Sequence, residues 1–210
     1  VTGLANQTSA RPWRSAVSET VWNDLLEAHQ AAAVPASTAA EPPHQPKAAI
    51  LACSDARVPP SVIFDQPPGS LFVVRIAGNT ANDAGLASLD YAVSKLGVEL
   101  VIVLGHTGCG AVQAAAAGTC EGLLEPVVRP ICEIAREHPT ADLDQLIELN
   151  VLSTMKSLRE HPGPVGTAAR ANALDLRGAI YDLRSGRLRT LSTDLVSTPT
   201  TTSSQGVHTP

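Results

Sequence analysis

Short apolar runs alternate with amphipathic segments through the middle of the chain. Residues 47–52, 71–75 and 99–104 are rich in Ala, Val, Leu and Ile, and their length is typical of buried strands. Residues 85–96 place apolar side chains at helical spacing, and Gly97 follows as a helix C-cap. Strands that alternate with helices predict an α/β domain with a central, mainly parallel β-sheet flanked by helices.

The N-terminal part follows a different pattern. Residues 13–33 predict a helix with Ser18 as its N-cap, and residues 34–46 are rich in Pro and Ala, as linkers are. We therefore interpret residues 1–46 as an N-terminal helical arm and linker, which precede a domain over residues 47–196.

The C-terminal part predicts further helices and a strand pair. Residues 61–64 and 111–117 predict short helices, and residues 124–160 predict a helical stretch that is interrupted near Pro139, with Thr140 as the cap of its second half. Residues 174–182 and 187–191 predict two strands joined by a turn at Ser185-Gly186. The Thr-, Ser- and Pro-rich tail over residues 197–210 predicts disorder.

Composition excludes several classes of protein. The net charge is −5 and no basic run occurs, which argues against a nucleic-acid partner. The apolar runs are far shorter than the roughly 20 residues of a membrane span. The chain begins at Val1 without a methionine or the pattern of a secretion signal, so we expect a fragment of a longer protein.

The chain holds four cysteines, Cys53, Cys109, Cys120 and Cys132. Two of them lie in a metal-like pattern with a histidine, and a chain of this size does not need disulfides. We therefore expect a reducing, cytoplasmic setting in which Cys120 and Cys132 are plain thiols.

Candidate metal ligands follow two of the predicted strands. Cys53 comes directly after residues 47–52, and His106 and Cys109 follow residues 99–104 with H-x-x-C spacing. Ligands of such sheets gather at the carboxyl ends of the strands. Two thiolates and an imidazole suit one zinc ion and leave a fourth position for water, substrate or Asp55. A closed structural site is the alternative, but the nearby Asp55 and Arg57 favour a catalytic one.

Three stretches resemble the β-class carbonic anhydrases: residues 52–80 (ACSDARVPPSVIFDQPPGSLFVVRIAGNT), residues 85–112 (GLASLDYAVSKLGVELVIVLGHTGCGAV) and residues 178–188 (GAIYDLRSGRL). The resemblance extends from about Gln45 to Leu191. It implies reversible hydration of carbon dioxide to bicarbonate and a proton by a zinc-bound hydroxide. It also implies one Zn²⁺ per subunit, held by Cys53, His106 and Cys109.

The resemblance assigns roles to further residues. Asp55 and Arg57 match the catalytic acid–arginine pair of the family, and Asp55 becomes the fourth zinc ligand in an inactive state that low pH favours. The implied substrate-binding residues are Phe72, Ala77, Gly78, Tyr91 and Gly110. The tyrosine reaches the site across a dimer in the family, so a homodimer or a tetramer is expected.

Two positions depart from the family pattern. His44 stands where a family glutamine contacts bicarbonate, and Gln45 is one place further along, so either can take this role. Arg75 and Tyr181 match two positions of a non-catalytic bicarbonate pocket, but Ile50 stands where that pocket has a tryptophan, which argues against the pocket.

Two other functions remain open from the sequence. The first is a carbon disulfide or carbonyl sulfide hydrolase on the same scaffold. The second is a regulatory or bicarbonate-supplying domain, fused to a sulfate-permease-like anion transporter in the membrane and located at its cytoplasmic face.

Overall fold

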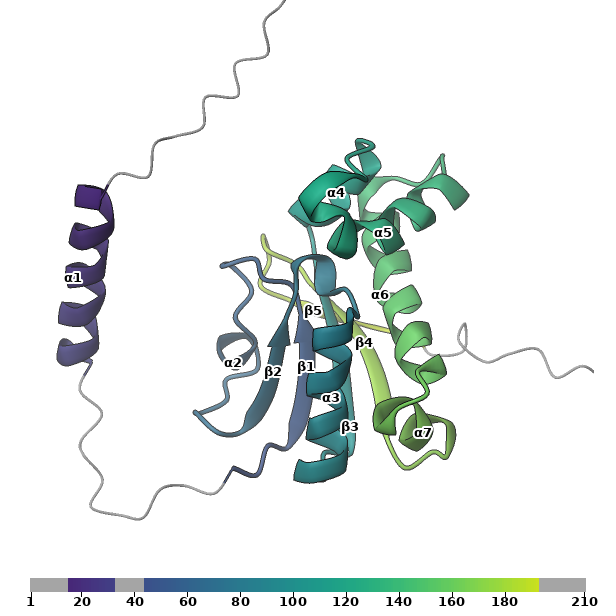
Figure 1. Cartoon of the computed structure of the whole chain (residues 1–210), viewed down its shortest axis with the longest axis horizontal. Helices are drawn as coiled ribbons and strands as arrows, with labels where there is room; N and C mark the ends of the chain where they lie inside the picture. Colours follow the sequence, from purple (N-terminus) through teal and green to yellow (C-terminus); the bar gives the residue numbers. More distant parts are fainter. Residues whose placement is uncertain (1–14, 33–43, 193–210) are drawn as a thin grey trace, which may run out of the picture. The chain divides into compact units, whose positions relative to one another are not determined.

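The computed structural model describes residues 15–32 and 44–192 (Figure 1). The chain divides into two compact units, Val1–Pro42 and Pro43–Pro210. The first contains helix α1 (Ser15–Ala31), in which Ser18 lies inside the helix rather than at its N-cap. Most of the predicted linker and the whole predicted tail lie outside the described residues. No helix in the described ranges is long and apolar enough to cross a membrane.

A five-stranded sheet forms the centre of the second unit, in the order β2-β1-β3-β4-β5. Its strands are β1 (Ala48–Ala52), β2 (Leu71–Arg75), β3 (Leu100–His106), β4 (Asp175–Tyr181) and β5 (Leu188–Leu191). The first four pair in parallel, and β5 runs antiparallel to β4. The predicted mainly parallel sheet and the hairpin at its C-terminal edge are therefore confirmed.

Helices cover the sheet mostly on one face. The helices after β1 are α2 (Pro60–Ile63), α3 (Asp83–Leu96), α4 (Gly110–Ala116), α5 (Glu125–Glu137), α6 (Leu143–Glu160) and α7 (Pro164–Arg170). Ala49 and Leu51 of β1 face a core that includes Leu89 of α3 and Val151 of α6. Ile50 points to the opposite face, because side chains alternate along a strand. The chain thus buries both faces of β1, as an AAILA run requires.

The predicted end of α3 is confirmed, and the predicted start of α6 is wrong. Gly97 ends α3 in the left-handed conformation, as predicted, with φ of 67°. Helix α6 begins after Asp142, not Thr140. The Asp142 side chain accepts a hydrogen bond from the backbone N–H of Gln145, and the Gln145 side-chain oxygen accepts one from the backbone N–H of Asp142. Helix α7 was not predicted.

Cys120 and Cys132 form a disulfide, with Cα atoms 6.1 Å apart. The prediction of plain thiols is therefore wrong. The chain reverses after α4, and this reversal brings the loop residue Cys120 against Cys132 of α5. Disulfides persist in oxidising compartments, so the cysteine-based argument for a reducing setting loses its basis.

Helix α6 lies unusually close to the sheet, and two strand glycines make this approach possible. A Cβ atom on Gly105 of β3 would lie 2.6 Å from Val151 Cγ2, and one on Gly178 of β4 would lie 2.6 Å from Met155 Sδ. Both partners belong to α6. The glycines therefore bring α6, and with it the buried Asn150, close to the carboxyl ends of β3 and β4.

Candidate metal centre

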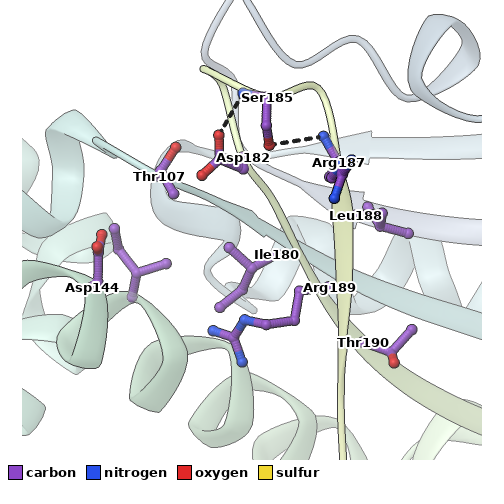
Figure 2. A pocket seen from close by; sticks show the side chains of 10 residues that line it. Thr107, Asp144, Ile180, Asp182, Ser185, Arg187, Leu188, Arg189 and Thr190 are labelled. Atoms are coloured by element: carbon purple, nitrogen blue, oxygen red, sulfur yellow. Dashed lines mark hydrogen bonds between the residues drawn. The ribbon is translucent and has the colours of Figure 1, made fainter.

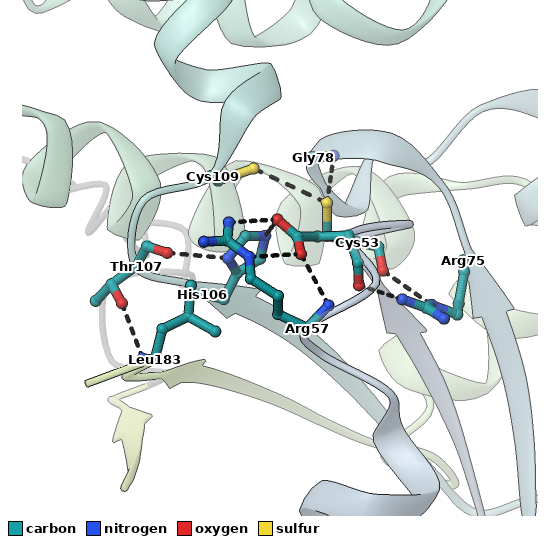
Figure 3. A network of polar contacts seen from close by, with 9 residues as sticks. Cys53, Arg57, Arg75, Gly78, His106, Thr107, Cys109 and Leu183 are labelled. Atoms are coloured by element: carbon teal, nitrogen blue, oxygen red, sulfur yellow. Dashed lines mark hydrogen bonds and ion pairs between the residues drawn. The ribbon is translucent and has the colours of Figure 1, made fainter. Parts of the chain in front are cut away.

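Three side chains converge at the carboxyl ends of β1 and β3 (Figure 3). Cys53 follows β1, His106 is the last residue of β3, and Cys109 is the N-cap residue of α4. The strands are parallel neighbours, and Ala52 pairs with Leu104. The two thiol sulfurs and an imidazole nitrogen all lie within 4.8 Å of one another, and all three residues are buried. The structure thus brings together the three residues that the sequence analysis selected as metal ligands.

The donor atoms of this cluster fit a zinc ion. The sulfurs of Cys53 and Cys109 are 3.9 Å apart. Nδ1 of His106 lies 3.0 Å from the carbonyl oxygen of Thr107, which accepts its proton and leaves a lone pair on Nε2. Nε2 is buried without a hydrogen-bond partner among the described residues. A buried nitrogen without a partner is costly unless a cation binds it, and a Cys₂His set is a known catalytic zinc arrangement.

The two thiols interact strongly with each other. The hydrogen bond between them lowers the pKa of Cys53 and raises the pKa of Cys109, which burial raises further. Burial acts to lower the pKa of His106, but the nearby Cys53 sulfur and its negative charge outweigh it, so the net direction is upward. The site therefore holds negative charge on sulfur that a bound cation would neutralise.

Asp55 and Arg57 form a close ion pair beside the cluster. Arg57 Nε donates to Asp55 Oδ1 at 2.9 Å and a terminal nitrogen donates to Oδ2 at 2.6 Å. These bonds hold the pKa of Asp55 well below its usual range and raise that of Arg57. Oδ2 lies 3.9 Å from Nε2 of His106. A carboxylate that stays ionised is thus fixed next to the open side of the cluster.

A second arginine holds the segment that carries Cys53 and Asp55. Arg75 is the last residue of β2, and its guanidinium donates to the backbone carbonyl of Cys53 at 3.0 Å and to that of Asp55. The sequence indicated Arg75 only as a position of a bicarbonate pocket. Its contacts show that it stabilises the loop after β1, and no local sequence signal indicates this, because the contact joins the end of β2 to a loop about 20 residues earlier.

The implied substrate-binding residues fall into two groups. Gly78 lies in the turn Ala77–Asn79 and donates its N–H to the Cys53 sulfur at 3.3 Å, and Gly110 begins α4. The other group consists of rings: His44 stacks on Phe72 with centroids 6.1 Å apart, and Phe72 lies 6.2 Å from Tyr91.

Two members of the ring group are open to solvent. Tyr91 is 49% exposed, and His44 is exposed as well. Gln45 is also exposed, next to this group in sequence. The ring cluster of His44, Phe72 and Tyr91 therefore presents an aromatic surface.

A surface pocket of about 560 Å³ lies on the other side of Thr107 (Figure 2). Its polar lining includes Asp144, Asp182, Arg187 and Arg189, and none of the three metal-cluster residues lines it. Thr107 connects the pocket to the cluster. Its hydroxyl accepts a hydrogen bond from the backbone of Leu183 in the β4–β5 turn, and its carbonyl oxygen bonds to Nδ1 of His106.

Comparison with known proteins gives a consistent result. The carbonic anhydrase family model matches residues 48–188. A carbonic anhydrase of Pseudomonas aeruginosa is 40% identical over 162 residues, which is 70% of this chain and 73% of that protein. Carbonic anhydrase 2 of Mycobacterium tuberculosis is 36% identical over 151 residues, 68% of this chain and 73% of that protein.

Solved structures agree with these relatives. The β-carbonic anhydrase CafA of Aspergillus fumigatus superposes with a TM-score of 0.67 at 28% identity, covering 88% of this chain and 90% of that one. The tetrameric β-carbonic anhydrases of Sordaria macrospora give a TM-score of 0.66 at 26% identity, covering 84% and 94%. The family model covers β1 to β4 and all three cluster residues, and together with the curated relatives and the solved structures it shows that the chain belongs to the β-class carbonic anhydrases.

Proposed function

We propose that this chain catalyses the reversible hydration of carbon dioxide to bicarbonate and a proton, with one zinc ion held by Cys53, His106 and Cys109. The observation that carries the proposal is the partnerless Nε2 of His106, which lies within 4.8 Å of two buried thiol sulfurs. Bound zinc supplies a Lewis acid that lowers the pKa of a coordinated water to about 7.

Asp55 orients the reacting water. Its carboxylate lies 3.9 Å from His106 Nε2, so it is placed to accept a hydrogen bond from a water at the open side of the cluster. Arg57 fixes both oxygens of Asp55 and keeps the group ionised. A water held there would have a lone pair directed at carbon dioxide; formation of the C–O bond would open one C=O π bond to give bicarbonate, and the proton lost from the water would pass to buffer. Because Asp55 bonds to Arg57, the structure resembles the arrangement in which Asp55 is not a fourth ligand.

The substrate-binding residues follow from the same placement. Ala77 and Gly78 form the turn beside Cys53 and provide a small apolar wall for carbon dioxide. Gly110 offers a backbone N–H at the start of α4 to an oxygen of bicarbonate. Phe72 stacks with His44 and Tyr91, so we assign it to the same substrate site as those two residues.

The working unit is a homodimer or a tetramer. The ring cluster of His44, Phe72 and Tyr91 supports this proposal, because it presents apolar area to solvent in the single chain. Tyr91, with His44 or Gln45, would then complete the site of the partner subunit. Sedimentation of the purified protein tests the oligomeric state, and Tyr91→Ala should shift it toward the monomer.

Metal analysis and stopped-flow hydration test the function. The purified protein should hold about one zinc per chain and hydrate carbon dioxide far faster than its Cys53→Ala variant. The same preparation should be assayed with carbon disulfide and carbonyl sulfide. Hydration no faster than in Cys53→Ala would overturn the proposal, and turnover of only the sulfur compounds would replace it with the hydrolase alternative.

A further inference from the structure

Asn150 is a buried amide in the middle of α6. Its side chain is 2% exposed, and Nδ2 donates to the backbone oxygen of Gly78 at 2.7 Å. These residues are 72 positions apart, so the bond joins α6 directly to the turn beside the metal cluster. An amide buried among apolar side chains costs free energy unless it is hydrogen-bonded, so the Gly78 oxygen is the partner that makes this position tolerable.

Gly78 carries this contact on to the metal cluster. While its carbonyl accepts from Asn150, its N–H donates to the Cys53 sulfur at 3.3 Å (Figure 3). Gly78 has φ of 69°, and a Cβ atom there would lie 2.7 Å from Ile131 Cδ1. The turn is therefore held between α5 and α6, with its N–H aimed at the sulfur.

Hydrogen bonds to ligating atoms orient those atoms and adjust how strongly they donate to a metal. An N–H directed at a thiolate stabilises its negative charge and fixes the direction of the sulfur lone pairs, so it favours the form of cysteine that binds a metal. We propose that Asn150 is a positioning residue: by holding the carbonyl of Gly78 it fixes the N–H donor on Cys53 Sγ, and so sets the metal affinity of the Cys53, His106 and Cys109 cluster. This inference rests on the proposed function, because it assumes that the cluster binds a metal.

Asn150→Leu removes the donor and keeps the number and branching of the side-chain heavy atoms. Loss of an interaction of this kind typically reduces metal affinity by about 10–100-fold. The dissociation constant for zinc, measured by competition with a chromophoric chelator, should rise by that factor. In the protein loaded with Co²⁺, the thiolate-to-metal charge-transfer band should move to lower energy, because the Cys53 sulfur loses a hydrogen bond. Asn150→Ser retains a hydroxyl donor. Its zinc dissociation constant and cobalt band should therefore lie between those of the unmodified protein and those of Asn150→Leu.

Thr154→Val is the matched control. Thr154 is a buried polar residue one turn further along α6, at 5% exposure. Its variant should leave the zinc affinity and the cobalt band unchanged.

A purely structural role for Asn150 gives a different result. It would lower the melting temperatures of metal-free and metal-loaded protein equally, with unchanged zinc affinity and cobalt band, and this outcome would overturn the inference. If the unmodified protein bound neither zinc nor Co²⁺, the proposed function itself would fail, and this inference with it. If Asn150→Leu does not fold, the comparison of Asn150→Ser with Thr154→Val decides on the same criteria.

Discussion

The guanidinium of Arg57 bonds to both carboxylate oxygens of Asp55, two residues earlier in the chain, at 2.9 and 2.6 Å. Arg57 also donates its backbone N–H to Oδ1 at 2.9 Å. One carboxylate thus receives three hydrogen bonds from a single residue, although the Arg57 side chain itself is 59% exposed. The orientation of Asp55 therefore depends on the two-pronged geometry of the Arg57 guanidinium more than on the presence of a positive charge nearby.

Arg57→Gln should therefore lower kcat/KM for carbon dioxide hydration by about 10²-fold, a magnitude typical of a displaced catalytic group. Arg57→Lys should have a kcat/KM only slightly above that of Arg57→Gln, because an ammonium group cannot reproduce the two-pronged contact. Zinc content should stay unchanged in both. Stopped-flow hydration assays measure the effect.

Arg177→Gln provides the control for this prediction. Arg177 bonds to Asp175 with the same two-residue spacing, at 2.8 Å through Nε and 2.7 Å through a terminal nitrogen. That pair lies at the start of β4, at the opposite end of the sheet from His106, which pairs with Tyr181 at the end of β4. Equal losses in Arg57→Gln and Arg177→Gln would show that Arg57 acts only through general stability.

Metal removal should destabilise the protein and abolish its activity. A ligand that binds only the folded state adds to its stability, so chelation should lower the melting temperature and zinc should restore it. Cys109→Ser should behave like the chelated protein and show no further response to chelator. Thermal unfolding with and without zinc tests this, and an undiminished response in Cys109→Ser would contradict the assignment of Cys109 as a ligand.

The disulfide should contribute to stability without affecting the metal. Cys120 and Cys132 are 12 residues apart, and closing a loop of about this length is worth at most about 3 kcal/mol. The Cys120→Ser, Cys132→Ser double variant should lose stability toward that limit in denaturant titrations and still bind one zinc per chain. A loss of zinc in the double variant would mean that these cysteines affect the metal centre.

The close approach of α6 to the sheet should make two glycines sensitive to substitution. Gly105→Ala and Gly178→Ala each place a methyl group 2.6 Å from an α6 side chain, and overpacking of this kind costs about 1–3 kcal/mol. Gly110→Ala serves as the comparison for stability, since no atom lies within 4 Å of a Cβ atom there. The free energy of unfolding of the three variants is measured in urea. Equal values for Gly105→Ala, Gly178→Ala and Gly110→Ala would contradict the close packing of α6.

The turn between β4 and β5 should show a pH-dependent contribution from Asp182. Its carboxylate accepts backbone hydrogen bonds from Ser185 at 2.7 Å and Arg184 at 2.8 Å, and these bonds lower its pKa. A lowered pKa in the folded state gives stability that is present above the ordinary aspartate pKa of about 3.9 and is lost as pH falls through the folded value. Asp182→Asn should therefore lower the melting temperature at pH 7, with a smaller difference near pH 3. An equal difference at both values would contradict the prediction.

The strands and the metal ligands were predictable because their signals are local. Cys53 and His106 each end an apolar run, and a parallel sheet brings such ends to one edge. The Cys120–Cys132 disulfide was not predictable, because it depends on how the chain reverses after α4. Thr140 was chosen as a helix cap from residue type alone, and only the reciprocal bonds of Asp142 and Gln145 distinguish the true start of α6.

The roles of Asn150 and His161 depend on contacts between distant segments. Asn150 bonds to a residue 72 positions away, and His161 bonds to Asp90, 71 positions earlier, at 2.9 Å. A single sequence gives no signal for such pairs, because neither partner lies in a pattern that indicates the other. The contacts that support the cluster were therefore missed, while the grouping of Cys53, His106 and Cys109 was predicted.

The order of the strands along the chain also sets the order in which the residues of the metal cluster are synthesised. The chain makes β1, then adds β2 on one side, and only later adds β3 on the other. Cys53 leaves the ribosome well before His106 and Cys109, and pairing of distant strands is slow. A metal that takes all three residues as ligands can therefore be held only after β3 and the start of α4 have been synthesised. Until then, Cys53 lacks both other members of the cluster.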